Sequence, residues 1–291
     1  MPGFNKFSAI TEAYDSGRVT YSGFRKLVSA TTATGVWMDM SMTGGGPPPN
    51  YYASSPLVWS TLSQSVDGGI YHGGDVSPAS KHVKSIMIAG SVVTTCIPSV
   101  FLLCDYLGYW PFVDMAGSVT LVGSGLSRYT DGVGVQAMLV QQATQAGGAT
   151  FTLNYTSPAG SGRTSKLMKC NTSTVNGSIV TTMPAHTATF SSSPFVGLQD
   201  GDTGIKSVQS VDWVLEDVGL VALVLIKPIA QIHLEPISSN VYCPSEKDFA
   251  INAVGTLPVI KDNAYLNFIA HPAGTFATSV IWGTLETIWS A

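Results

Sequence analysis

The stretch GSGRTS at positions 160–165 has the glycines and the basic residue that could cradle a phosphate group. A phosphate-binding loop of that type needs the pattern G-x-x-x-x-G-K-[ST], because backbone N–H groups wrap the phosphates while the lysine reaches the terminal one. Here Ser157 stands where the first glycine is required, and Arg163 stands where the lysine is required. The stretch is therefore predicted to be a connecting loop, with Arg163 available for a surface or interface contact.

Two groups of residues suggest metal ligation. His72, Asp75 and His82 could form a zinc set, but they lack both close paired spacing and the i, i+4 presentation of a helix. Asp200 and Asp202 suggest calcium, yet no third acid follows at the spacing of a calcium loop, so a tight turn is the preferred interpretation. We expect no metal site and no cofactor.

Serines and carboxylates are the residues of this sequence that could take part in hydrolytic catalysis. The stretch GSGLS at Gly123 lacks the spacing of a G-x-S-x-G nucleophile elbow. Asp105 and Asp114, in the aromatic stretch CDYLGYWPFVD, are the acids that could form the facing pair that glycoside hydrolysis needs. Acids near Gly and Pro usually cap turns, so both are interpreted as turn or interface residues and no catalytic residue is assigned.

The composition is unusually poor in charge. Only 11% of the 291 residues are Asp, Glu, Lys or Arg, against about 25% in a typical soluble domain. Hydroxyl and amide groups must then supply much of the polar surface, and these are cheaper to desolvate than charges. This favours a subunit that buries much of its surface against neighbours. The net charge of −4 and the absence of a Lys/Arg-rich run beyond Arg25 and Lys26 predict no specific nucleic-acid binding.

No segment has the features of a membrane span or a secretory signal. The most apolar run, VGLVALVLI from Val218 to Ile226, is half the length of a membrane helix, which needs about 20 residues. We expect a soluble protein made in the cytoplasm, without membrane contact. Four cysteines without a C-x-x-C pair are predicted to be reduced and mostly buried: Cys96, Cys104, Cys170 and Cys243.

The N-terminal part contains one helix signal and one arm. Apolar residues from Phe4 to Tyr14 recur at helical spacing and end before Gly17, which predicts a short amphipathic helix. In TGGGPPPNYY the glycines and prolines argue against a helix and a central strand, so this stretch is predicted to be an ordered arm or long loop. Tyr51 and Tyr52 would anchor it, either against a neighbouring subunit or over its own sheet.

From Lys84 onward, short runs rich in β-branched and aromatic residues predict strands. TFTLNY alternates apolar and polar residues, and the AGG stretch before it predicts a hairpin turn between Gln142 and Thr150. FLLCDYLGYWPFVD, from Phe101 to Asp114, fits strand or helix. The other predicted strands are SIMIAGSVV, VTLVG, GVQAMLVQQ, SVQSVDWVL, GLVALVLIKPIAQIHL, AYLNFIAH and TFATSVIWGTLETIW.

These patterns predict a mainly β protein, an antiparallel β-sandwich or jelly-roll-like fold with one or two short helices and long Gly/Pro loops. We find neither an internal repeat nor a clear linker. The expectation is one domain over residues 1–291, with the helix and the arm (about 1–55) placed on a β body (about 56–291).

Several blocks resemble, in order and spacing, a largely uncharacterised family of tailed-bacteriophage virion structural proteins. The blocks are GVWMDMSMTGGGPPPNYY, GGIYHGGDVSPASKH, LLCDYLGYWPFVDM, SRYTDGVGVQAMLV, GRTS, GDTGIKSVQSV and AYLNFI. The resemblance covers nearly the whole chain and implies a place in the virion, but its motifs are turns, aromatic clusters and Pro arms, without a catalytic residue to transfer.

The sequence and the resemblance together predict a non-enzymatic structural protein of a phage particle, a capsid decoration (cement) or shell subunit. Decoration is preferred because no window of about 20 residues keeps the helical period of the spine helix in the tailed-phage shell fold. A tail-tube or tail-tip protein is the first alternative, and a glycan-binding or glycan-hydrolysing β-sandwich module is the second. The expected partners are copies of the chain and other proteins of the capsid lattice, contacted through Tyr51, Tyr52 and Arg163.

Overall fold

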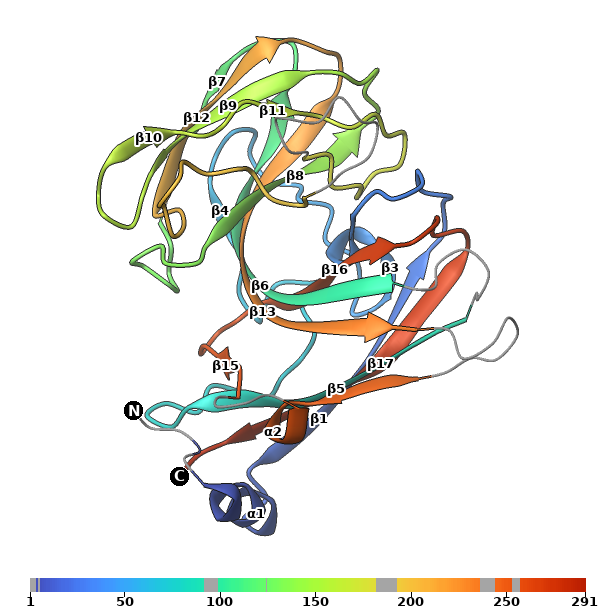
Figure 1. Cartoon of the computed structure of the whole chain (residues 1–291), viewed down its shortest axis with the longest axis vertical. Coiled ribbons are helices and arrows are strands. Elements are labelled where there is room, and N and C mark those ends of the chain that lie inside the picture. The colour runs from blue at the N-terminus through green and yellow to red at the C-terminus, as the bar shows by residue number, and fades with distance from the viewer. Residues whose placement is uncertain are drawn as a thin grey trace.

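The computed structural model describes residues 4, 6–91, 99–123, 125–181, 193–235, 244–252 and 257–291. These residues form a mainly β protein with antiparallel strand ladders and two short helices, α1 (Phe7–Asp15) and α2 (Phe249–Asn252) (Figure 1). The predicted fold class is thus confirmed. Within the described residues no helix is long and apolar enough to cross a membrane.

The strands form three sheets, named here lower, middle and upper as they stand in Figure 1. The lower sheet has the order β14 (Ser245–Asp248), β5 (Lys81–Gly90), β17 (Ser279–Trp289), β1 (Val19–Val28) and β3 (Gly44–Gly46), with β15 (Val259–Ile260) on β5. The middle sheet has the order β2 (Met38–Asp39), β16 (Leu266–Pro272), β6 (Ser99–Asp114), β13 (Leu220–Leu234) and β8 (Gln136–Ala143), with β4 (Ser60–Thr61) on β6. The upper sheet has the order β10 (Gly162–Thr164), β9 (Thr150–Thr156), β12 (Ser207–Leu215) and β7 (Val119–Thr120), with β11 (Met168–Lys169) on β9. The 3-10 turn η1 (Met40–Met42) follows β2.

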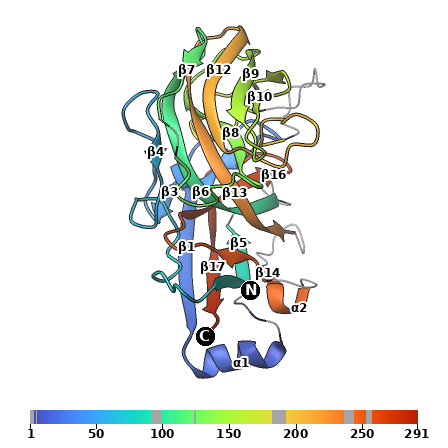
Figure 2. The same cartoon turned by 90° about the vertical axis from the view of Figure 1, so that its left-hand side faces the viewer.

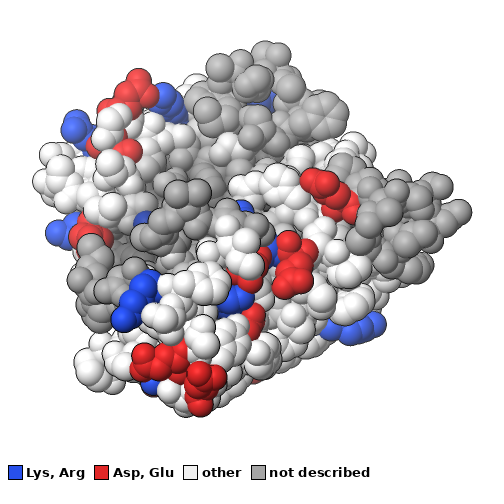
Figure 3. Space-filling model, turned by 60° about the horizontal axis from the view of Figure 1, so that its bottom comes forward, with Lys and Arg blue, Asp and Glu red and all other residues white. Residues whose placement is uncertain are grey.

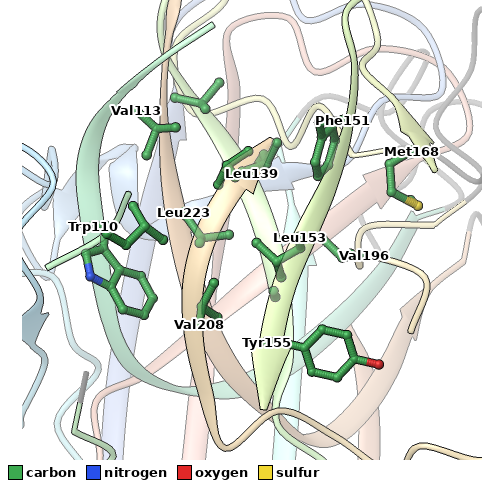
Figure 4. Close-up of a cluster of buried hydrophobic side chains, with 14 of the residues drawn as sticks. Trp110, Val113, Leu139, Phe151, Leu153, Tyr155, Met168, Val196, Val208 and Leu223 are labelled. Atoms are coloured by element: carbon green, nitrogen blue, oxygen red, sulfur yellow. The ribbon is translucent and has the colours of Figure 1, made fainter. Parts of the chain in front are cut away.

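The middle sheet is long and curled, so that one of its faces contributes to two cores. Along β6, Phe101 and Leu103 pack in the core against the lower sheet, whereas Leu107 and Trp110 pack in the core against the upper sheet. Figure 4 shows the upper core, where Trp110 and Leu223 of the middle sheet meet Val208, Leu153 and Phe151 of the upper sheet.

The opposite face of the middle sheet carries a third buried cluster. Tyr106, Tyr109 and Tyr265 lie there with aliphatic side chains of β8 and β13, and Met42 and Tyr52 cover them. Both faces of the middle sheet are therefore buried, which explains the near-continuous apolar runs in β8 and β13.

Several local predictions are confirmed. The N-terminal helix exists as α1 and buries Ile10 and Ala13. The undecided stretch from Phe101 to Asp114 is a strand, β6. Cys104 and Cys170 are buried and free, while Cys96 and Cys243 lie outside the described residues.

The predicted hairpin around Ala146–Gly148 is wrong. Strand β8 pairs with β13 in the middle sheet, whereas β9 pairs with β10, β11 and β12 in the upper sheet. The residues from Ala137 to Gln141 are all buried, as expected for a strand covered on both faces, so β8 does not share the one-sided pattern of β9. Gly147 and Gly148, both at positive φ, belong to a connection between sheets.

The prediction of a loop at GSGRTS is also wrong in part. Gly162–Thr164 form β10, which pairs with β9 from Thr156 to Asn154. The turn of this hairpin lies just before it, where Ser157 N donates to Ser161 O at 2.9 Å. Strand β1 was not among the predicted strands.

Candidate functional site

The proline arm lies over the middle sheet and is held there by its own chain. Its glycines form β3 on Arg25–Leu27 of β1, and Lys26 Nζ donates a hydrogen bond to Pro47 O at 2.9 Å. Asn50 N donates to Ser41 O at 2.9 Å. Gly45 is required by geometry, because a Cβ on it would stand 2.0 Å from Arg25 O.

Tyr52 is the anchor of the arm and is fully buried. Its hydroxyl donates to Asp39 Oδ2 and lies 2.7 Å from Ser41 Oγ, while its ring packs on Tyr109 with the centroids 4.8 Å apart. The prediction of Tyr52 as an anchor holds for the internal arrangement. In this conformation its side chain is not accessible to a neighbouring subunit.

Asp39 is the acceptor at the centre of this buried network. Besides Tyr52, it accepts from Tyr106 OH and from Ser41 N, each at 2.8 Å. Burial raises the pKa of Asp39 above its usual range, and these hydrogen bonds oppose that rise. Sequence reasoning missed two residues that act on Asp39. Tyr106 donates a hydrogen bond to it, and the charge of Lys26 attracts it. The signal that could have found Lys26 is its place in the alternation of β1, between the buried Phe24 and Val28.

Tyr51, by contrast, is 60% exposed. It lines a surface cavity of about 430 Å³ together with Met38, Met42, Thr43 and Asn176, and none of the lining residues is charged. Of the two tyrosines, Tyr51 is therefore the one that a ligand or a partner can reach.

Arg163 lies on β10, at the margin of the upper sheet, far along the chain from the arm. Its side chain is half-exposed, and its Nε stands 3.7 Å from Asp202 Oδ1. Tyr155 OH donates to the other oxygen of Asp202, whereas Asp200 pairs with Lys166. Asp202 N donates to Gln199 O in a turn, so the turn interpretation of this segment is confirmed.

Asp105, one of the two suspected carboxylates, is fully buried on β6 between the upper and lower cores. Arg128 binds both of its oxygens, from Nη2 at 2.7 Å and from Nε at 2.9 Å, and also donates to Leu62 O and Tyr106 O. Tyr265 N donates to Asp105 Oδ1 at 3.0 Å. Burial raises the pKa of Asp105, and the Arg128 guanidinium opposes that rise.

Asp114, the other suspect, is exposed and caps a turn by accepting from Ala116 N at 2.9 Å. Asp114 lies nine positions beyond Asp105 along the strand, a chain length of about 30 Å, whereas a hydrolytic pair stands within about 10 Å. The interpretation of Asp114 as a turn residue is confirmed, and Asp105 is a buried ion-pair partner, neither a turn nor a surface residue.

The residues of the suspected zinc set each have a different role. His72 is buried, and because Ala264 O can only accept, the ring donates to it from Nε2 at 2.9 Å. Lys81 Nζ lies 3.3 Å from Nδ1, and burial lowers the pKa of His72 to about 4. Asp75 accepts from Asn263 N, and His82 Nδ1 donates to Leu257 O. Across the described ranges no three His, Cys, Asp or Glu residues are placed to hold a metal ion.

Comparison with known proteins returned no matching family model, no matching curated protein and no matching solved structure.

Proposed function

We propose that the chain is a non-enzymatic structural subunit of a phage particle, and that it decorates or builds the capsid as one of many copies. The virion assignment itself rests on the sequence resemblance. The structure supports the role of a subunit through the outward face of the upper sheet.

A row of uncharged polar side chains crosses that face. Thr120 of β7, Ser210 of β12, Asn154 of β9 and Thr164 of β10 stand opposite one another in register, and we call them the polar row. Thr164 Oγ1 donates to Asn154 Oδ1 at 2.7 Å, and Asn154 Nδ2 donates to Ser210 Oγ at 2.9 Å. The side chains of this row thus satisfy much of their hydrogen bonding among themselves.

Such a face favours contact with another protein. A neighbour that covers the polar row displaces little tightly bound water, because its groups are uncharged and already paired. Asp212, which accepts from Asn154, is the acid next to the row. The polar row is the observation that supports the proposal, because it is a defined surface on which uncharged polar side chains take the place of charged ones.

Mass spectrometry of purified particles tests the proposal. A decoration or shell role predicts about one copy per capsid protein, and only a handful of copies would contradict it. Immunogold labelling along the tail in place of the head would favour the tail-tube alternative.

A variant with a charge on the row tests the contact itself. Thr120 is exposed, so the Thr120→Lys variant should fold. It should occupy particles less than the wild type, because the lysine charge is costly to desolvate in a contact. Thr11→Lys, at an exposed position of α1, is the matched control and should bind as the wild type. Equal occupancy of both variants would remove the polar row from the contact.

A second candidate function rests on the cavity at Tyr51. An exposed aromatic ring beside Thr43 and Asn176, without charge, is an arrangement that could stack on a sugar and bind its hydroxyl groups. Glycan-array binding that is lost in Tyr51→Ala but retained in Tyr71→Ala, a change at an equally exposed tyrosine, would favour this function. Binding to no glycan would exclude it.

A further inference from the structure

Strand β1 leaves one margin of the lower sheet open. It pairs with β17 along its whole length, from Val19 to Val28, without a register shift. On its other side β3 pairs only with Arg25–Leu27, and within the described part of the chain no backbone hydrogen bond reaches Val19–Phe24 from that side. Figure 2 shows β1 at the side of the sheet, next to β17. We call residues 19–24 of this margin the open edge.

The open edge has none of the features that usually protect an edge strand. Proteins block such edges with charges, prolines, bulges or very short strands, because free N–H and C=O groups recruit another strand. The open edge reads V-T-Y-S-G-F and contains neither a charge nor a proline.

Other strands at sheet margins are protected, β8 by backbone hydrogen bonds with residues 177–180 and four more by their own sequences. Strand β14 reads S-E-K-D, β10 holds Arg163 within three residues, β7 has two residues, and β3 is followed by Pro47. Figure 3 shows charged side chains in small separate groups on the underside of the molecule. The open edge is thus an exception among these margins.

We propose that the open edge pairs with the open edge of a second copy of this chain, antiparallel and about a twofold axis, so that two lower sheets join into one. This inference rests on the proposed function, which requires contacts between copies, and it names the surface. A second copy fits because the edge is uncharged and therefore does not repel itself. Antiparallel pairing lets two identical strands satisfy each other.

The faces of the sheet limit the register of this pairing. Tyr21 points outward and is 65% exposed, whereas Ser22 points inward and is buried. Directly opposed residues of an antiparallel pair share a face. Under this rule the two registers that pair the most residues of the open edge, about five, oppose Tyr21 to Tyr21 or Ser22 to Ser22. Among the described residues the buried Ser22 Oγ has no hydrogen-bond partner, and the second register would supply one.

A charged edge tests the pairing in solution. A ladder of about five residues buries little surface, so sedimentation must be followed up to high protein concentration. The wild type should approach twice the monomer mass. Tyr21→Lys should remain monomeric, because two lysines are then directly opposed in the first register and diagonal neighbours in the second. Lysine is preferred to an acidic residue because Tyr21 lies near Glu286, and a second carboxylate at this place would be repelled within the monomer itself. Val214→Lys, at an equally exposed residue of the upper sheet, is the matched control and should dimerise as the wild type.

Cysteine cross-linking determines the register independently. Under mild oxidation, Tyr21→Cys should give a covalent dimer in the first register and Ser22→Cys in the second, well above the wild type with its own four cysteines. Circular dichroism checks that each variant is folded. A wild type that stays monomeric, with neither variant cross-linked, overturns the proposal.

The two proposals can fail separately. Monomers without cross-links that nevertheless occupy particles in many copies would overturn the paired edge and leave the virion function. Dimers in solution of a protein that is absent from particles would overturn the virion function and leave the paired edge.

Discussion

At the scale of single residues, the buried charges are the least ordinary feature of the molecule. Lys26, Asp39, Asp105 and Arg128 are all buried, in a chain that has few charges to begin with. Asp105 and Arg128 neutralise each other in direct contact. Among the described residues Lys26 donates to one neutral acceptor, Pro47 O, and the attraction of the Asp39 carboxylate offsets only part of the cost of its burial.

Lys26 should make stability depend on alkaline pH. Burial lowers its pKa from 10.5 to about 8, which costs about 3 kcal/mol at neutral pH. Between these values the unfolded chain binds more protons than the folded one, so stability should rise with pH from about 8 to 10.5. In Lys26→Met this rise should shrink, and the variant should be more stable at pH 7 by about 1–2 kcal/mol, after loss of the Pro47 hydrogen bond. Urea unfolding at several pH values measures both effects, with Lys206→Met as an exposed control; equal pH profiles for wild type and Lys26→Met would contradict the prediction.

Removing Arg128 should be far more damaging than removing a surface arginine. Arg128→Met leaves the carboxylate of Asp105 buried without its cation and should cost about 3–5 kcal/mol in urea unfolding. Asp105→Asn combined with Arg128→Met should recover part of that loss, because the uncompensated charge is then absent. A double variant less stable than Arg128→Met alone would show that the arginine acts mainly through Leu62 O and Tyr106 O.

At the scale of elements, the arm is attached to the body by one of its two tyrosines. Tyr52→Phe removes a donor from the buried Asp39 and should lower the free energy of unfolding by about 1–3 kcal/mol. Tyr51→Ala should change it by less than about 0.5 kcal/mol, since the side chain is largely in solvent. Thermal or urea unfolding of the two variants side by side measures the difference. A larger loss of stability in Tyr51→Ala would show that Tyr51, and not Tyr52, anchors the arm.

Strand identity was largely predictable, and strand pairing was not. Alternation in TFTLNY and β-branched runs such as SVQSVDWVL mark strands through local chemistry, and both are found as β9 and β12. Pairing depends on contacts distant in sequence, so the short AGG connection was taken for a hairpin although it crosses between sheets. Strand β1 was missed because Lys26 interrupts its inward apolar pattern. The Asp39 network escaped prediction for a similar reason, since Asp39, Tyr52 and Tyr106 come together only in the fold.

At the scale of the whole molecule, β6 and β13 unite the two main cores. Both strands contribute side chains to the upper and to the lower core, and they pair with each other over nearly their full lengths. Neither core can lose its packing without disturbing strands that the other requires. The molecule should therefore unfold in a single transition.

Two probes can check this cooperativity. Trp59, Trp110 and Trp213 pack in the upper core, so a variant in which Phe replaces Trp37, Trp282 and Trp289 reports on that core through fluorescence, while far-UV circular dichroism reports on all strands. The two urea curves should coincide with one midpoint, as two-state unfolding requires. Separate midpoints would show that the cores unfold independently.

The ion pair of Asp105 and Arg128 also has a consequence for descent. The guanidinium of Arg128 donates to four oxygens on three residues, so a change at one of the two positions leaves a buried partner unpaired, whereas a joint replacement by apolar residues can be tolerated. Among distant relatives, the acid at 105 and the arginine at 128 should thus be inherited or lost together. Such co-variation can identify kinship after most of the remaining sequence has diverged.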